Sequence, residues 1–331
     1  MWLLLFLWFQ FFFCSALIFI AGIKLSFYAD VIAEKTGLGK SWIGMLMLAP
    51  VTSLPELFNG LSAILYVRAP DLAVGDILGS CVFNLLILCF LDVFSGRLPL
   101  TSRINAHHTF AAGFGIIMLA LVGMGITSTT SMPHWKWIGI SSPILICLYI
   151  VGMKIFYKTD KKTVSNETNS SYTDISLSSS LQKFSLSALV IVIAATWLPK
   201  VGAALATATG LGQTFIGSIL IAFSTSLPEV VVSLSALRLG NVDMAVSNLV
   251  GSNLINLCLL AIYDVLFLAG PLLAFVHKNQ LINVFSAIMM ASIFISELNL
   301  HPRKKILFLS FGSWAIISVY LLNLGVLYYL K

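Results

Sequence analysis

Apolar runs of about 20 residues recur along the chain and alternate with short polar turns. A run of this length lets an α-helix cross the hydrocarbon layer of a bilayer, which is roughly 30 Å thick. The pattern predicts an all-α integral membrane protein with ten transmembrane helices at residues 2–23, 42–66, 72–94, 108–129, 137–157, 184–205, 214–237, 243–268, 280–297 and 306–329.

One long polar stretch, residues 158–183, interrupts this pattern and is rich in Ser and Thr. Such a composition cannot bury a core, so we expect a flexible linker. The linker separates an N-terminal half, residues 1–157, from a C-terminal half, residues 184–331, each with five predicted spans.

Composition excludes a soluble globular domain. Of the 331 residues, 59% are hydrophobic and 10% are charged, whereas soluble domains carry about a quarter charged residues. The net charge of +6 would suggest nucleic acid as a partner in a soluble protein. In a membrane protein, Lys and Arg in cytoplasmic loops explain it, and no nucleic-acid partner is expected.

The distribution of Lys and Arg predicts the orientation in the membrane. Most of these 19 residues fall on the side of the linker if the N-terminus lies outside, and cytoplasmic loops are the basic ones. We therefore expect both termini outside, the linker in the cytoplasm, and residence in the plasma or inner membrane. The first apolar run is expected to be a helix and not a signal peptide, because it is long and lacks a basic start.

The two halves repeat one another in sequence. Residues 37–44 reappear as 210–217, and Thr-Ser-Leu-Pro-Glu at 52–56 reappears at 225–229. After a slip of one residue the matches continue, pairing Asp71, Gly79, Ser80, Asn84 and Asp92 with Asp243, Gly251, Ser252, Asn256 and Asp264. An odd number of spans per half makes the halves inverted repeats, and transporter sites commonly lie between such repeats on helices that Pro or Gly interrupts.

Two acids lie inside predicted spans. Glu56 follows Pro50 and Pro55, and Glu229 follows Pro228. A carboxylate within a membrane is costly and is usually functional, while a protonated, hydrogen-bonded structural Glu is the alternative. Proline frees backbone carbonyls in the turn before it, and these need a buried or wet environment. Thr52 and Thr225 each precede a Glu by four residues, so they can share its helix face.

Two polar stripes with a spacing of four residues lie in the next span of each half. They consist of Asp76, Ser80 and Asn84, and of Asn248, Ser252 and Asn256. Hydrogen bonding between helices is the alternative explanation for such stripes. Their repetition near the Glu helices favours a site lining. All these groups are oxygen ligands, which suit calcium, sodium or protons.

Other candidate chemistry is weaker. Five cysteines lie within spans without a CxxC pair, so neither a disulfide framework nor a zinc site is expected: Cys14, Cys81, Cys89, Cys147 and Cys258. The histidines fall in loops or at span ends, where a solvated or interfacial role is expected: His107, His108, His134, His277 and His301. We find no nucleophile with a base partner, so no enzyme and no catalytic residue is expected.

Two ionised Glu match one calcium ion or a pair of monovalent ions, which would make the two kinds of ion mutually exclusive. Mutual exclusion with alternating access is a physical basis for exchange. A calcium/proton or other cation/proton antiporter is the alternative, and a passive cation channel is a further one. The sequence leaves the coupling ion, the stoichiometry and the role of Asp76 open.

The repeated motifs at about 37–94 and 210–267 resemble those of the cation/calcium exchanger superfamily, which includes sodium/calcium exchangers. The resemblance implies ten helices in inverted halves and exchange of calcium for sodium, with inorganic cations and lipid as partners, and no cofactor or obligatory protein partner. The ion ligands it implies are the Ala49 and Ala222 carbonyls, Thr52, Ser53, Glu56, Ser80, Asn84, Thr225, Ser226, Glu229, Ser252 and Asn256. Glu56, Glu229, Thr52 and Thr225 form the centre of this set, with Asp76 and Asn248 as additional candidates.

The chain departs from the family pattern at several places. Asp76 stands where Asn is usual, Cys81 replaces the Asn that Asn253 keeps, and Val51 and Ser224 replace Gly. Asn256 stands where some members carry Asp, which lowers the expectation of potassium coupling.

Overall fold

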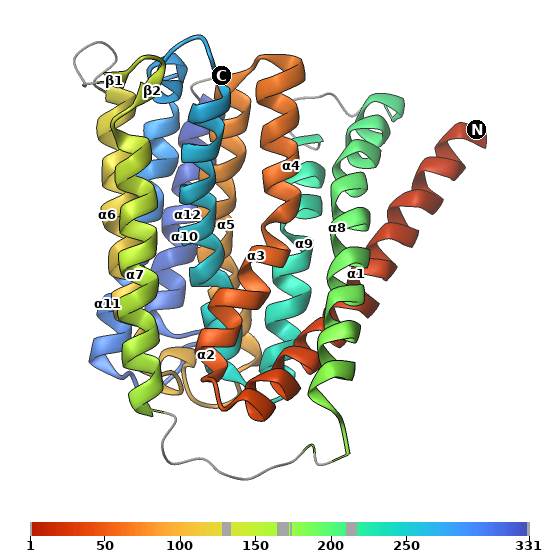
Figure 1. Cartoon of the computed structure of the whole chain (residues 1–331), viewed down its shortest axis with the longest axis vertical. Helices are drawn as coiled ribbons and strands as arrows, with labels where there is room; N and C mark the ends of the chain where they lie inside the picture. The colour runs from red at the N-terminus through yellow and green to blue at the C-terminus, as the bar shows by residue number, and fades with distance from the viewer. Residues whose placement is uncertain (1, 128–133, 164–171, 173, 210–216, 330–331) are drawn as a thin grey trace. The chain divides into compact units, whose positions relative to one another are not determined.

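A computed structural model describes residues 2–127, 134–163, 172, 174–209 and 217–329, and its described part is almost wholly helical (Figure 1). Nine helical segments in this part are long and apolar enough to cross a membrane. The expected span 214–237 corresponds to a further helix, α9 (Gly217–Arg238), whose first side chains lie outside the described residues. The predicted all-α membrane architecture is thereby confirmed.

The chain divides into two compact units that do not coincide with the two sequence halves. Unit 1 contains Met1–Phe58 and Asn166–Asn248, and unit 2 contains Asn59–Ser165 and Leu249–Lys331. Each unit therefore combines pieces of both repeats. The boundary passes through α4 (Leu54–Ser62) and α10 (Val242–Leu266).

Unit 1 is built around the long helix α1, which runs along α8 and α9 (Figure 1). Its elements are α1 (Trp2–Thr36), α2 (Lys40–Ile43), the short π-helix η1 (Gly44–Leu48), α3 (Ala49–Thr52), the start of α4, α8 (Leu177–Ala208), α9 and the start of α10. Apolar residues such as Ile18, Ala195 and Leu198 form its core. The other face of α1 exposes large aromatic and aliphatic side chains, as expected of a helix in lipid.

Unit 2 is a helical bundle in which α11 packs against α5, α6 and α12. Its elements are the end of α4, the short π-helix η2 (Ala63–Val67), α5 (Pro70–Phe94), the 3-10 helix η3 (Leu100–Ser102), α6 (His108–Thr127), β1 (His134–Trp135), β2 (Ile138–Gly139), α7 (Ser141–Thr163), most of α10, the 3-10 helix η6 (Leu272–Phe275), α11 (Gln280–Leu300) and α12 (Phe311–Tyr329). The two strands form an antiparallel hairpin in which Trp135 pairs with Ile138.

The helices beside the linker are longer than the apolar pattern predicts. Helix α7 continues to Thr163, and α8 begins at Leu177, so both extend into the stretch 158–183. Ser176 caps the start of α8, where its hydroxyl accepts a hydrogen bond from the Ser179 amide at 3.2 Å. A Ser cap satisfies an amide that would otherwise lack a partner, which permits a helix start beyond the apolar run.

Buried Asp92 at the end of α5 joins three segments of unit 2. Its carboxylate accepts from the Leu100 amide at 2.7 Å, the Ser310 amide at 2.7 Å and the Ser313 hydroxyl at 2.9 Å. Lys305 adds an ion pair at 3.2 Å. Hydrogen bonds to a charged group are worth about 1.5–3 kcal/mol each, so Asp92 holds the start of α12 firmly against α5.

Asp264, the repeat equivalent of Asp92, has a matching set of partners. It accepts from the Leu272 amide at 2.6 Å, the Gly139 amide at 2.8 Å and the Ser142 hydroxyl at 2.5 Å. In each half the first donor lies eight residues after the Asp, and the other two lie just before and within the first turn of the last helix of the other half. Repeated contacts between equivalent atoms show that the duplication extends from sequence to structure.

Candidate cation site

The first Glu helix is interrupted where the sequence predicts it. Helix α3 ends at Thr52, Ser53 takes a non-helical backbone conformation with φ −87° and ψ 0°, and α4 begins at Leu54. Pro50 and Pro55 flank this point and supply no amide hydrogen. By contrast, α9 is one helix from Gly217 to Arg238 with Pro228 inside it. The two repeats therefore present their Glu residues on differently shaped segments.

Both acids are buried, and both belong to unit 1. Glu56 is 1% exposed and Glu229 is 0% exposed. The neighbouring hydroxyl residues Thr52, Ser53, Thr225 and Ser226 are also buried. Neither carboxylate faces lipid, so both are available for a site inside the protein.

The Thr52 hydroxyl brings the two repeats together. It lies beside the Glu229 carboxylate of the other repeat, and it approaches Asn248 Oδ1 at 3.4 Å. The Asn248 amide in turn donates to Ser233 Oγ at 2.9 Å. Sequence reasoning missed Ser233, although it lies four residues after Glu229 and therefore on the same helix face.

Several oxygens of this group lack a hydrogen-bond partner among the described residues. They are Ser53 Oγ and both carboxylate oxygens of Glu229. Buried polar atoms are almost always hydrogen-bonded in folded proteins, and an unpaired buried carboxylate is especially costly. Buried oxygens without a hydrogen-bond partner are groups that a bound cation would satisfy.

In unit 2, the stripes on α5 and α10 meet at equivalent positions of the repeat. The Asn253 amide donates to the Cys81 carbonyl at 3.2 Å, and the Cys81 thiol lies 3.9 Å from the Asn253 carbonyl. Asn84 Nδ2 also donates to Asn253 Oδ1 at 3.0 Å. Residues 81 and 253 match in the repeat, so the pseudo-two-fold axis of unit 2 passes between them.

Unit 2 also contains buried polar atoms without partners in the described part of the chain. They are Asp76 Oδ2, Asn84 Oδ1 and both amide atoms of Asn256. Ser80 and Ser252 of the same stripes are buried as well. Hydrogen bonding between helices explains the Asn84 Nδ2 group, but it does not explain the remaining oxygens of Asp76, Asn84 and Asn256 or Asn256 Nδ2.

Of the two candidate carbonyl ligands, that of Ala49 already accepts two hydrogen bonds within its own segment. The Ala49 carbonyl accepts from the Ser53 amide at 3.0 Å and from the Thr52 hydroxyl at 3.3 Å. The side chain of Ala222 lies outside the described residues.

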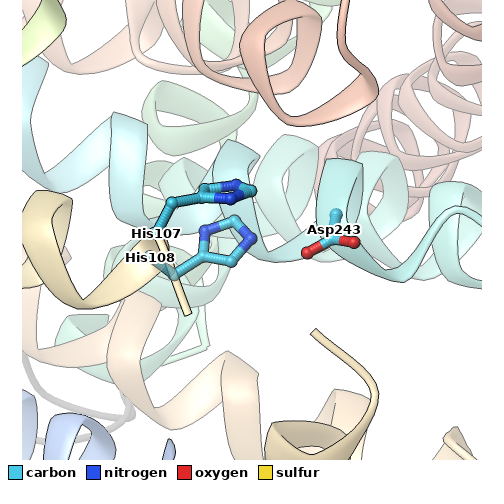
Figure 2. A group of neighbouring side chains, drawn as sticks. All are labelled: His107, His108 and Asp243. Carbon is cyan, nitrogen blue, oxygen red and sulfur yellow. The ribbon is translucent and has the colours of Figure 1, made fainter. Parts of the chain in front are cut away.

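Of the solvated or interfacial role expected for His107 and His108, the solvated alternative is wrong. They are 6% and 0% exposed, and their ring centroids lie 4.5 Å apart (Figure 2). His107 Nε2 lies 3.8 Å from Asp160 Oδ1, and the His107 ring contacts Phe156 edge to face. Asp243, also labelled in Figure 2, belongs to unit 1. The pair lies at the start of α6, five residues after η3 ends.

Comparison with known sequences decides the family. The sequence model of the family "Sodium/calcium exchanger protein" matches residues 6–163 and 179–330. The chain belongs to the sodium/calcium exchanger family. The match covers both repeats and leaves out most of the linker.

Relatives of this exchanger-family chain occur in archaea and in a bacterium. An uncharacterized membrane protein of Methanocaldococcus jannaschii is 24% identical over 247 residues, which cover 72% of this chain and 77% of that protein. The inner membrane protein YrbG of Escherichia coli is 24% identical over 256 residues, or 71% of each chain. The sodium/calcium exchanger MaX1 of Methanosarcina acetivorans is 41% identical over 75 residues, or 23% of this chain and 21% of that protein.

A solved structure of the sodium-calcium exchanger NCX_Mj has the same fold. It superposes with a TM-score of 0.74 at 19% identity and covers 97% of this chain and 99% of that one. The fold is therefore that of ten helices in two inverted five-helix repeats, as predicted.

Proposed function

We propose that this family member is a secondary active antiporter that exchanges calcium for sodium by alternating access at a mid-membrane site that contains Glu56 and Glu229. The observation that carries the proposal is the buried Glu229 carboxylate, which lies beside Thr52 of the other repeat and lacks a hydrogen-bond partner among the described residues. A purely structural acid would be hydrogen-bonded.

Charge supports exchange of one divalent ion against monovalent ions. Glu56 and Glu229 together carry about two negative charges when ionised, which one calcium ion or two sodium ions neutralise. Hard oxygen ligands favour both cations over transition metals. Because one pair of carboxylates cannot bind a calcium ion and two sodium ions at once, binding of one kind of ion displaces the other.

We propose that the remaining ligands are the other predicted residues: Ala49, Thr52, Ser53, Ser80, Asn84, Ala222, Thr225, Ser226, Ser252 and Asn256. Their support is the burial of all of them except Ala222, whose side chain lies outside the described residues, and the unpartnered oxygens of Ser53, Asn84 and Asn256. Asp76 and Asn248 are additional candidates. Asp76 would add a third negative charge, which a proton or another monovalent ion would compensate.

The test is calcium uptake by the purified protein in liposomes under one ion gradient at a time. An outward sodium gradient should drive uptake, and Glu56→Gln should abolish it. Glu297→Gln is the matched control, because Glu297 is a buried membrane acid whose carboxylate accepts from the Gly312 amide at 3.0 Å. Uptake that follows a proton gradient and ignores sodium would establish the calcium/proton alternative, and non-saturable flux without a counter-ion would establish a channel.

We also propose that both termini lie outside a cell membrane and that the linker lies in the cytoplasm. Support comes from the concentration of Lys and Arg on the linker side. A cysteine introduced next to Ser176 should react with membrane-impermeant reagents only from the cytoplasmic side. Reaction from the outside of intact cells would reverse the orientation.

A further inference from the structure

Outside the candidate site, four segments of unit 1 meet at the corner between α1 and α2. Asp30 near the end of α1 is buried, and it forms an ion pair with Lys40 of α2 at 3.0 Å. The Lys40 ammonium also donates to Asn241 Oδ1 in the turn between α9 and α10 at 2.5 Å. One side chain thus connects the ends of α1 and α9 to the start of α2.

Tyr172 of the linker completes this group. Its hydroxyl donates to Asp30 Oδ2 at 2.8 Å, and its amide donates to Glu34 Oε1 at 3.1 Å. Its ring packs edge to face on Phe27 at 5.5 Å between centroids. Burial and the Asp30 carboxylate raise the pKa of the Tyr172 phenol to about 12, so the hydroxyl remains a donor at physiological pH. Polar and aromatic contacts together bind this residue of an otherwise polar linker to α1.

The contact is connected mechanically to the helix that carries Glu229. Ser26 lies one turn before Asp30 on α1 and donates to the Val232 carbonyl of α9 at 2.8 Å. Gly22, one turn earlier, packs so closely that an added Cβ would lie 2.7 Å from Val231. If the end of α1 shifts, it must therefore slide against α9 at the turn that follows Glu229.

The second repeat lacks this ion pair. The residues that correspond to Asp30 and Lys40 are Ala203 and Gln213. The group therefore acts at one end of the molecule only, which distinguishes it from the repeated Asp92 and Asp264 contacts. A feature added to one repeat is suited to regulation, because it can favour one of two related conformations.

We propose that Tyr172 binds the central linker to Asp30 and that this contact slows the exchange cycle by holding the ends of α1 and α9 in one arrangement. Alternating access requires the residues around Glu229 to change their exposure, so α9 and the α1 segment packed on it must move. The rate effect rests on the proposed exchange function, whereas the binding of the linker does not.

Tyr172→Phe is the test variant, since it removes one hydroxyl and keeps the ring and the amide. Tyr66→Phe is the matched control, because Tyr66 is 84% exposed. Loss of a hydrogen bond to a charged acceptor changes an equilibrium by about tenfold or more. Amide hydrogen exchange around residue 172 should therefore become about tenfold faster in Tyr172→Phe, and calcium exchange in liposomes should become at least about threefold faster. Lys40→Gln, which copies the second repeat, should also accelerate calcium exchange.

Unchanged hydrogen exchange in Tyr172→Phe would overturn the linker contact. Faster hydrogen exchange with an unaltered transport rate would overturn the slowing effect. A wild-type protein that transports no calcium would instead refute the proposed function, and the hydrogen-exchange comparison would still decide whether Tyr172 binds the linker to α1.

Discussion

Replacement of Glu229 by Gln tests whether Glu229 is an ion ligand or a structural acid. The change keeps the size of the side chain and one carbonyl oxygen, and it removes the negative charge. In the structure both carboxylate oxygens lack a hydrogen-bond partner among the described residues. The folded protein without cation therefore loses no hydrogen bond, whereas the protein with calcium loses one of the charges that compensate the ion.

The expected size of the effect follows from this difference. Breaking a buried, charge-compensated group by removing one partner costs about 3–5 kcal/mol. At 1.4 kcal/mol per factor of ten, calcium affinity should fall roughly 140- to 3700-fold. The thermal unfolding midpoint in cation-free buffer should stay the same or rise, because an unpaired buried carboxylate is itself unfavourable.

Two measurements on the same purified protein check this prediction. Calcium titration by isothermal calorimetry gives the affinity, and thermal unfolding with and without calcium gives the stability. Wild-type protein should gain stability from calcium in proportion to the logarithm of its concentration above Kd, and Glu229→Gln should gain none at the same concentration. Glu297→Gln should keep the calcium-dependent gain.

A structural role for Glu229 would produce the opposite pattern. The variant would then unfold at lower temperature without cation and would still be stabilised by calcium. That result would refute the reasoning from unpartnered oxygens, whatever the transport rate.

Three further predictions follow from other contacts. Asp76→Asn, which copies Asn248 of the other repeat, should remove one compensating monovalent charge from the cycle, measured as fewer sodium ions or protons moved per calcium ion; an unchanged count of both would exclude Asp76 from the site. Asp264→Ala leaves three buried donors unpaired and should lower the free energy of unfolding by about 3 kcal/mol or more, measured by denaturation in detergent, and a loss below 1 kcal/mol would contradict this. Tyr172, whose pKa is about 12 in the folded protein and about 10 when unfolded, should contribute stability below pH 10 that is lost between pH 10 and 12; the absorbance difference between wild type and Tyr172→Phe should therefore titrate near pH 12 and not near pH 10.

The repeat made much of the fold predictable. Equivalent Glu residues beside equivalent Pro residues, in runs long enough to span a membrane, already require burial on the inside of the protein. The structure confirms that Glu56 and Glu229 are buried. Their role as ligands, and that of the hydroxyl and amide residues around them, stays a prediction that the transport experiments test.

Other features depend on partners that are remote in the sequence. The Asp92 carboxylate binds residues more than 200 positions away, and an acid at the end of an apolar run is normally placed at the membrane surface. The burial of His107 and His108 is missed for the same reason. A position in a predicted loop suggests exposure to solvent, and only the packing of the helix bundle buries the two side chains. The boundary between the units, which passes through α4 and α10, has no signal in hydropathy because the apolar runs continue across it.

The partners of Asp92 and Asp264 make each half of the chain depend on the other. Asp92 of the first half binds the backbone and hydroxyl at the start of α12 in the second half, and Asp264 of the second half binds the start of α7 in the first. A single half would leave its own carboxylate and its own donor groups unsatisfied at the same time. Neither half can therefore satisfy these groups by itself, and each needs an inverted partner half beside it.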